Sequence, residues 1–518
     1  MLRTLFRSAE LLHLTRSRSY TTKMSSYDVL TESYTRLRAT ISARDKSSPL
    51  PTQSALQSGR SSLPSHLPTT GLGHEATHNH LLTDIVPALS NQSLSSTYFG
   101  FITGGVLPIA EAADNIVTAL DQNVQVHLPE SSLSTEAEDA ALRMLIDLLE
   151  LGSSEDWPSR TVTTGATASN ILGLACAREW IVDSRLDEAR AGSTVAKAGL
   201  LRACAAAGVK EIQILTSMAH SSLSKSASVV GLGHDCVKEC AASEDEPWRL
   251  SLDKVERELE RSGDGVVSII AISAGEVNTG RFATNALDMP KLRSLADKYG
   301  AWIHVDGAFG IFARALPQDE DKFLDLRAHT AGLDLADSIT VDGHKLLNVP
   351  YDTGMFFCRH KSIPATAMSN PNAAYLSAVP SSIQSPLNIG LENSRRFRAL
   401  PLYAALLSEG KAGYGQILAR MVALAREIAT YFKDSPDYEW LPDESAHIES
   451  VFMGVLFRAK DKKVNDELVQ KLNSSAKLYV SGTSWKGEKA VRIAVSNWRS
   501  SVEDFAELKK VFDAVVKP

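Results

Sequence analysis

The sequence predicts an α/β protein whose large, mostly parallel sheet is covered by helices on both faces and is followed by a smaller α+β domain. Two observations support this prediction. From about residue 160, short β-branched runs alternate with segments of helical apolar spacing, a pattern typical of parallel sheets. From about residue 400, long helical segments give way to short strands and a last helix, which indicates a second domain.

The composition excludes several classes of protein. The chain has 518 residues, of which 44% are hydrophobic and 22% charged, so it has enough apolar material for a large core. Its net charge of -7 argues against a nucleic-acid partner, because such proteins present a basic face. No apolar run approaches the roughly 20 residues that a membrane-spanning helix needs, and we expect no membrane span.

The first residues differ from the rest of the chain. Residues 1–23 hold five Arg or Lys residues, a single acid and many Ser and Thr residues, as mitochondrial transit peptides do. A processing site after Tyr20 fits this interpretation, and we expect residues 1–24 to be a transit peptide that directs the protein to mitochondria. The alternatives are a disordered basic tail or translation from Met24, which would leave the protein in the cytoplasm.

The expected elements follow in order along the chain. Residues 25–115 form a helical arm, with a helix in YDVLTESYTRLRATIS and then a Ser/Pro-rich linker up to residue 70. Residues 116–370 form the large domain, with strands in RTVTTG, EIQILTS, GVVSIIAISA, AWIHVDGA and SITVDGHK. Residues 371–518 form the small domain, with strands in VFMGVLFRA and AVRIAVSN and a final helix in SVEDFAELKKVFDAVV.

The five cysteines are scattered along the chain and do not form a metal-binding pattern. His234, Cys236 and Cys240 lie close together, but no second cluster completes a four-ligand zinc site. We therefore expect no metal.

Four polar stretches fall at the ends of expected strands, where open parallel sheets place their ligand sites. TTGATASN joins a strand to a helix through small residues, which suits a phosphate at the helix amides but also serves as a plain connector. Asp306 ends a strand as a buried acid that needs a partner, either in a site or in a structural ion pair. His220 and Lys345 follow two further strands, although a lysine there could also extend to solvent.

Together the four stretches suggest pyridoxal phosphate as cofactor. A lysine amine forms a Schiff base with the aldehyde of this cofactor, and a carboxylate pairs with its ring nitrogen. A flat side chain covers one face of the ring, and a helix N-terminus holds the phosphate. The phosphate loop, His220, Asp306 and Lys345 follow one another within one α/β domain.

At these residues the chain resembles the group II pyridoxal-phosphate-dependent amino-acid decarboxylases, which include aromatic amino acid, histidine and glutamate decarboxylases. The resemblance spans roughly residues 70–500 and rests on TTGATASN, AHSSLSKS, HVDGAFG, VDGHKLLN and NSRRFRALPLYAAL. It implies the aminotransferase-like fold type I, a homodimer and the decarboxylation of an L-amino acid.

The resemblance also implies a role for each site residue. Lys345 is expected to carry the Schiff base, Asp306 to face the ring nitrogen and His220 to stack on the ring. The other expected contacts are Ala166 and Thr167 to the phosphate with His344 nearby, Ala308 to the opposite ring face, and Arg492 to the substrate carboxylate.

Three departures set the chain apart from well-known relatives. Glu276 and Val277 stand where many relatives have two threonines, and Asp342 replaces a common asparagine. No tyrosine lies between Tyr375 and Arg395, where a mobile loop of those relatives carries one into the neighbouring subunit's site.

The missing tyrosine leaves open which group returns a proton to Cα after CO2 departs. A general acid must lie within hydrogen-bond reach of the atom that it protonates. We expect the proton from His220, Tyr351 or Glu276.

Two alternatives to decarboxylation stay open. An aminotransferase or a carbonyl-forming aldehyde synthase fits the same motifs, because the outcome depends on which bond at Cα stands perpendicular to the ring. A catalytically silent scaffold of the same fold is the other alternative, and the retained lysine, aspartate, histidine and phosphate loop argue against it.

Overall fold

The computed structural model describes residues 26–44, 48–371, 382–443 and 446–517. The expected transit peptide lies outside these residues, as does part of the tyrosine-free segment, at 372–381. The chain divides into two units, Met1–Lys46 with Pro51–Ser90 and Ser47–Leu50 with Asn91–Pro518. Within the described residues, no helix combines the length and the apolar composition that crossing a membrane requires.

The first unit is built from helices α1 (Ser26–Ala43), α2 (Gln53–Ser62) and α3 (His74–His80). Helix α2 lies within the stretch expected to be a linker, so that expectation was wrong for these residues. Thr52 caps the helix by accepting a hydrogen bond from the Ala55 amide at 3.2 Å. Gly59 lets α2 pack closely on the short 3-10 helix Val86–Ala88, because a Cβ at Gly59 would lie 2.7 Å from the Ala88 Cβ.

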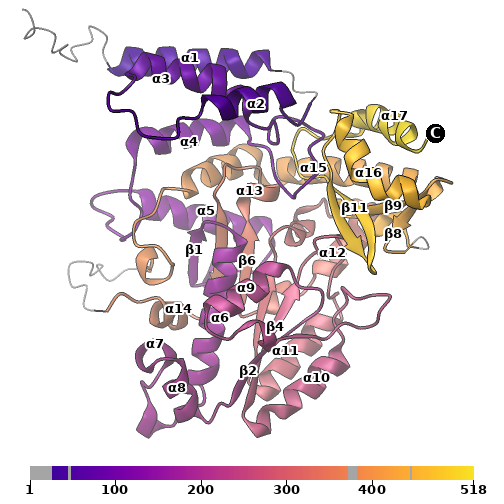
Figure 1. Cartoon of the computed structure of the whole chain (residues 1–518). Helices are drawn as coiled ribbons and strands as arrows, with labels where there is room; N and C mark the ends of the chain where they lie inside the picture. The colour runs from indigo at the N-terminus through magenta and orange to yellow at the C-terminus, as the bar shows by residue number, and fades with distance from the viewer. Residues whose placement is uncertain (1–25, 45–47, 372–381, 444–445, 518) are drawn as a thin grey trace, which may run out of the picture. The chain divides into compact units, whose positions relative to one another are not determined.

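Seven strands form the main sheet of the second unit, in the order β1-β7-β6-β5-β4-β2-β3 (Figure 1). Strand β7 is antiparallel to both of its neighbours, and the other pairs are parallel. This confirms the expected mostly parallel sheet, although β7 itself was not anticipated. The strands are β1 (Ser159–Thr163), β2 (Glu211–Thr216), β3 (Val237–Glu239), β4 (Val266–Ser273), β5 (Trp302–Asp306), β6 (Ser338–Asp342) and β7 (Gly354–Cys358).

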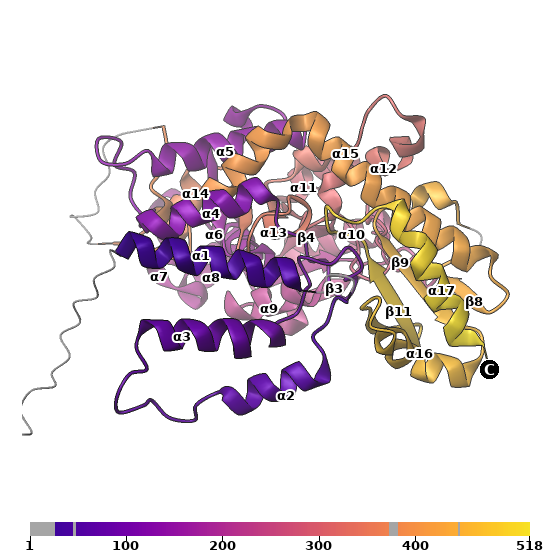
Figure 2. The same ribbon diagram turned by 90° about the horizontal axis from the view of Figure 1, so that it is seen from above.

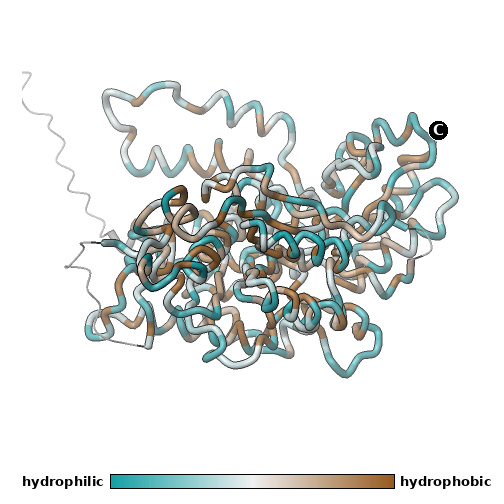
Figure 3. The backbone as a smooth tube through the Cα atoms, turned by 90° about the horizontal axis from the view of Figure 1, so that it is seen from below, coloured by the Kyte–Doolittle hydropathy of each residue, from teal (hydrophilic) through white to brown (hydrophobic). Residues whose placement is uncertain are grey.

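Helices cover both faces of this sheet, as expected. In β4, Val267 and Ile269 pack in the layer that contains α6, whereas Ile270 and Ile272 pack in the layer that contains α5 and α11. The apolar segments accordingly gather in the middle of the domain (Figure 3). The helices of the large domain are α4 (Pro108–Leu120), α5 (Ser134–Leu148), α6 (Ala166–Asp183), α7 (Val195–Ala198), α8 (Leu200–Ala207), α9 (Ser221–Val229), α10 (Leu252–Leu259), α11 (Asp288–Tyr299), α12 (Leu324–Thr330), α13 (Gly343–Leu346) and α14 (Ser362–Ala367).

A smaller antiparallel sheet with helices follows, as the change of pattern predicted. Its strands lie in the order β10-β11-β9-β8. Helix α15 (Ala399–Asp434), kinked at Gly410, contacts α4 and α5 of the large domain and β8 and β9 of the small one (Figure 2). The remaining elements are β8 (Tyr438–Leu441), β9 (Gly454–Ala459), β10 (Ser481–Trp485), β11 (Glu488–Ala494), α16 (Lys462–Ser474) and α17 (Phe505–Val516).

A buried ion pair ties the segment before α15 to the edge of the main sheet. Arg395 pairs with Glu138 of α5, and their side chains are only 1% and 5% exposed. Arg395 also donates to Thr161 Oγ1 at 3.0 Å, and Glu138 accepts from the Val162 amide at 3.1 Å. Both partners are therefore fixed to strand β1.

We expect Glu138→Ala to lower the free energy of unfolding by about 3–5 kcal/mol, because Arg395 would stay buried without its counter-charge. Urea denaturation of the apoprotein measures this. Asp147→Ala is the matched control on the same helix, because the Asp147–Lys411 pair is 73% and 60% exposed and contributes little. Equal unfolding midpoints for the two variants would show that the buried pair does not stabilise this edge.

Candidate active site

Five strands bring their ends to one edge of the main sheet, where a cavity of about 850 Å³ opens. Strands β1, β2, β4, β5 and β6 run in the same direction, so their carboxyl ends meet there. The residues that follow them line the cavity together with a side chain from β11 of the small domain: Ala166 and Thr167, His220, Glu276, Asp306 and Ala308, His344 and Lys345, and Arg492. The structure therefore brings all the sequence-predicted site residues together.

The N-terminus of α6 opens into this cavity. Gly165, with φ of 151°, precedes the helix and supplies no side-chain cap. A Cβ on Gly354 of β7 would lie 2.4 Å from the Gly165 Cα, so Gly354 has no room for a side chain. Thr167 and Ala168 of the first helical turn line the cavity. The amides of Thr167 and Ala168, together with the helix dipole, suit this end of α6 to an anion such as phosphate.

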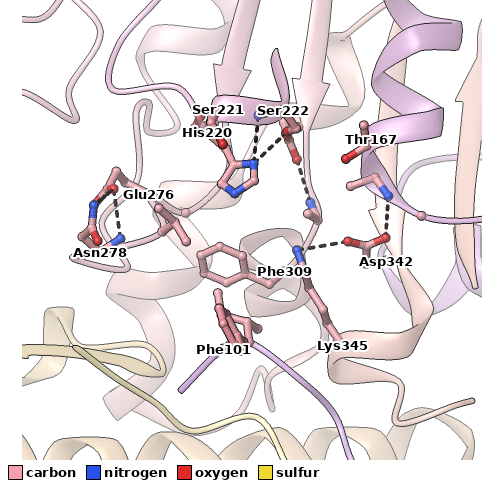
Figure 4. A pocket seen from close by; sticks show the side chains of 18 of the residues that line it. Phe101, Thr167, His220, Ser221, Ser222, Glu276, Asn278, Phe309, Asp342 and Lys345 are labelled. Carbon is pink, nitrogen blue, oxygen red and sulfur yellow. Dashed lines mark hydrogen bonds and ion pairs between the residues drawn. The ribbon is translucent and has the colours of Figure 1, made fainter. Parts of the chain in front are cut away.

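Lys345 lies on α13 and forms an ion pair with Asp342, with 3.0 Å between Nζ and Oδ2 (Figure 4). The other oxygen of Asp342 accepts the Ala166 amide at 2.6 Å. His344 Nε2 lies 3.8 Å from the same carboxylate, which is 2% exposed. Asp342 therefore links the lysine to the start of α6, a role that the sequence did not reveal.

Asp306 ends β5 with its carboxylate at the cavity. Its Oδ2 accepts a hydrogen bond from Asn170 Nδ2 at 2.9 Å, and its Oδ1 accepts the Ala308 amide at 3.2 Å. Both donors are neutral, so they orient the carboxylate without cancelling its charge.

His220 caps α9, and its ring points into the cavity (Figure 4). Nδ1 accepts the Ser222 amide at 3.2 Å and lies 2.7 Å from the Ser222 hydroxyl, which places the ring proton on Nε2. Desolvation lowers the pKa of His220, and the charge of Asp306 opposes this only in part. The ring is therefore neutral at neutral pH.

Tyr351 stacks near His344, with 4.4 Å between ring centroids, and both line the cavity. Desolvation raises the pKa of Tyr351 to about 12, so its phenol keeps its proton at neutral pH. Burial lowers the pKa of His344, whose Nδ1 accepts the Thr353 amide at 3.3 Å.

Glu276 is held inside its own loop. One oxygen accepts from the Asn278 amide and side chain at 2.9 and 3.0 Å, and the other from the Thr279 amide and hydroxyl at 2.7 and 2.8 Å. Four donors thus occupy the carboxylate, and Figure 4 shows it turned toward Asn278.

Arg492 enters the cavity from β11. Its guanidinium donates to the Val277 carbonyl at 3.2 Å and the Gly100 carbonyl at 2.5 Å. Among the described residues, its buried Nε has no hydrogen-bond partner. Desolvation lowers the pKa of Arg492, and the charge of Glu276 partly opposes this. A carboxylate in the cavity would meet a buried cation there.

Three further site residues were missed by sequence reasoning. Asn170 stood within the motif TTGATASN but was given no role. Phe101 and Phe309 form apolar walls, and Lys345 Nζ lies 5.9 Å from the Phe309 ring centroid. Phe309 could have been found from HVDGAFG, whereas no local signal points to Phe101.

A family model, the pyridoxal-dependent decarboxylase conserved domain, matches residues 85–460. The chain belongs to this family. The sequence-based resemblance is thereby confirmed, and so is pyridoxal phosphate as the cofactor.

Individual relatives are more distant. The chain is 29% identical over 319 residues to L-2,4-diaminobutyrate decarboxylase of Acinetobacter baumannii, which covers 60% of this chain and 58% of that protein. It is 24% identical to aromatic-L-amino-acid decarboxylase of Bacillus atrophaeus, over 58% of this chain and 61% of that protein. The chain thus matches about three fifths of the length of these curated relatives.

The fold also matches a solved structure, that of Catharanthus roseus tryptophan decarboxylase in complex with L-tryptophan. The TM-score is 0.77 with 18% identity, covering 96% of this chain and all of that one (100%). Fold type I, expected from the motifs, is thereby confirmed.

The residues of this chain fit the family's cofactor. The open first turn of α6 suits a phosphate, and the glycine contact behind it leaves room for close approach. Asp306, with only neutral donors, suits a protonated ring nitrogen, and Lys345 presents a primary amine to the same cavity.

Proposed function

We propose that the protein is a pyridoxal-phosphate-dependent decarboxylase that releases the α-carboxylate of an L-amino acid as CO2. The observation that carries this proposal is the convergence of Lys345, Asp306, His220 and the open end of α6 on one cavity. Bound pyridoxal phosphate supplies an aldehyde for the lysine amine and an electron-poor ring that accepts the electrons left behind by CO2.

Each side chain of the site has a distinct task in this proposal. Lys345 would hold the cofactor covalently between turnovers, and Asp306 would accept a hydrogen bond from the protonated ring nitrogen. His220 and Ala308 would hold the ring, and Thr167 and Ala166, with His344 nearby, would hold the phosphate at the start of α6.

Arg492 binds the substrate through a carboxylate in this proposal. Its guanidinium is a buried cation at the wall of the cavity and would attract a carboxylate there. Phe101, Val277 and Phe309 form apolar walls around this position. They exclude water, which strengthens the charge interactions inside the cavity.

Tyr351 is the group that we assign to the return of a proton to Cα. It lines the cavity and stays protonated at neutral pH, so it has a proton to give. Glu276 is the weakest of the three candidates, because its oxygens already accept four hydrogen bonds. His220 carries its only ring proton on Nε2 and is the second candidate.

The proposed activity is tested by incubating the holoenzyme with each proteinogenic amino acid and with diaminobutyrate, while CO2 and amine are measured together. Lys345→Ala should abolish both products, because the amine that holds the cofactor is lost. Borohydride reduction followed by peptide mapping should label Lys345 in the wild type. Lys361→Ala is the matched control and should keep full activity. A label on Lys361, or turnover by the Lys345 variant, would refute the assignment.

The proton donor decides between amine and aldehyde as product. We expect Tyr351→Phe to slow amine release at least tenfold and to raise the share of aldehyde formed under air, because the unprotonated carbon then reacts with oxygen. Product analysis under air and under nitrogen measures both effects. Glu276→Gln should leave the ratio unchanged. If Tyr351→Phe keeps the wild-type ratio while His220→Gln shifts it, the donor is His220.

We propose further that the active protein is a homodimer. The strongly exposed apolar side chains of the second unit include Phe101 at 56%, Ile116 at 52% and Leu120 at 64%. Phe101 also lines the cavity, so a second copy that covered it would help to close the site. Light scattering of active enzyme should give twice the chain mass of 56.1 kDa. Full activity at the mass of one chain would contradict the proposal.

A further inference from the structure

A line of hydrogen bonds runs from Asp306 into the core of the large domain. Asn170 Nδ2 lies 2.9 Å from Asp306 Oδ2, and Asn170 Oδ1 lies 2.9 Å from His304 Nε2. On the other side of the ring, Nδ1 lies 2.8 Å from Ser338 Oγ, which is 2.9 Å from Trp302 Nε1. Asn170, His304, Ser338 and Trp302 are each 0% exposed.

The chemistry of the groups fixes the direction of these bonds. The indole nitrogen of Trp302 can only donate, so Ser338 Oγ accepts it. Among the described residues the other hydrogen-bond partner of this buried hydroxyl is His304 Nδ1, so the hydroxyl hydrogen is satisfied when it points there. His304 then carries its proton on Nε2 and donates it to the oxygen of Asn170. The amide nitrogen of Asn170 is thereby turned toward Asp306. Complete burial lowers the pKa of His304 to about 4, in keeping with a neutral ring that holds one proton.

Helix α6 is shaped to admit the His304 ring. A Cβ at Gly173 would lie 2.4 Å from His304 Cε1 and 2.5 Å from Nδ1, so any side chain at this position would displace the ring. Asn170 lies three residues earlier and therefore on the same face of the helix. One face of α6 thus supplies both the space for the imidazole and the amide that it orients.

We propose that His304 and Asn170 are positioning residues that hold the Asp306 carboxylate aimed at the cofactor's ring nitrogen. This inference rests on the role proposed above for Asp306. A carboxylate that is turned toward the ring nitrogen offers it both an acceptor and a counter-charge, so the donors on the protein side that set its orientation matter. His304 fixes the orientation of the Asn170 amide. This line of hydrogen bonds from Trp302 to Asn170, called the relay below, therefore presents a donor and not an acceptor to Asp306.

The test reads the protonation of the ring nitrogen directly. Holoenzyme is prepared with pyridoxal phosphate labelled with 15N in the ring, and its 15N chemical shift is measured by solid-state NMR. We expect a protonated nitrogen in the wild type and an unprotonated one in His304→Phe and Asn170→Ala. Pyridoxal phosphate should also bind these two variants about tenfold to a hundredfold more weakly, as expected on losing a hydrogen bond to a charge.

Two further variants separate positioning from general damage to the core. In His304→Gln, the side-chain amide can still donate to Asn170 and accept from Ser338, so the protonated signal should return. Val305→Ala alters the same strand on its other face and should keep the protonated signal at a lowered melting temperature. A protonated nitrogen in both His304→Phe and Asn170→Ala would overturn the inference, as would its loss in Val305→Ala.

Asp306→Asn distinguishes failure of this inference from failure of the proposed function. If Asp306→Asn loses the protonated signal while His304→Phe and Asn170→Ala keep it, Asp306 has its proposed role and the relay does not support it. If Asp306→Asn itself keeps the protonated nitrogen, the assigned role of Asp306 is wrong, and the inference about His304 and Asn170 fails as well. Should His304→Phe fail to fold, Asn170→Ala interrupts the same line from the helix.

Discussion

Strands β1, β2, β4, β5 and β6 run in one direction, so their carboxyl ends share one edge of the sheet. Pairing within the sheet satisfies the backbone hydrogen bonds of each strand up to its last residue. The side chains that follow the strands can therefore face a common cavity. Strand β7 runs the other way and enters at this edge through Gly354, which packs on Gly165 without a side chain. That contact positions the open end of α6 beside the acids and the lysine. The whole site depends on this shared edge.

Two carboxylates end neighbouring strands at this edge, and the structure compensates them differently. Asp342 has a cation, Lys345, and the Ala166 amide. Asp306 has only the neutral donors Asn170 and the Ala308 amide. Asp306, which is partly buried at the cavity, therefore keeps its need for a positive partner. Asp342 is therefore neutralised by the protein itself, whereas Asp306 is left to pair with a cationic ligand. A protonated pyridine ring is such a ligand.

Local patterns in the sequence predicted the sheet, the second domain and the residues at the strand ends, because alternation and strand-terminal polar groups depend on neighbouring residues alone. Contacts between distant segments could not be read in this way. The sequence showed Asp342 as a substitution, but only the pairing of β6 with β7 brings it to α6. Helix α2 was taken for linker because the stretch around it is rich in Ser and Pro, whereas the Thr52 cap and the packing of Gly59 stabilise the helix.

Strand β5 has polar side chains in the core that connect to the active site. Parallel strands buried on both faces are usually apolar throughout. Ile303 and Val305 follow this rule on one face, whereas Trp302, His304 and Asp306 alternate on the other. A wholly apolar face would need no hydrogen-bond partners, so packing alone does not account for a buried imidazole between an indole and a carboxylate. Each polar group is satisfied only because Ser338 and Asn170 stand opposite. Among these hydrogen-bonded residues, Asp306 alone lines the cavity. The hydrogen bonds behind it therefore set the orientation of its carboxylate.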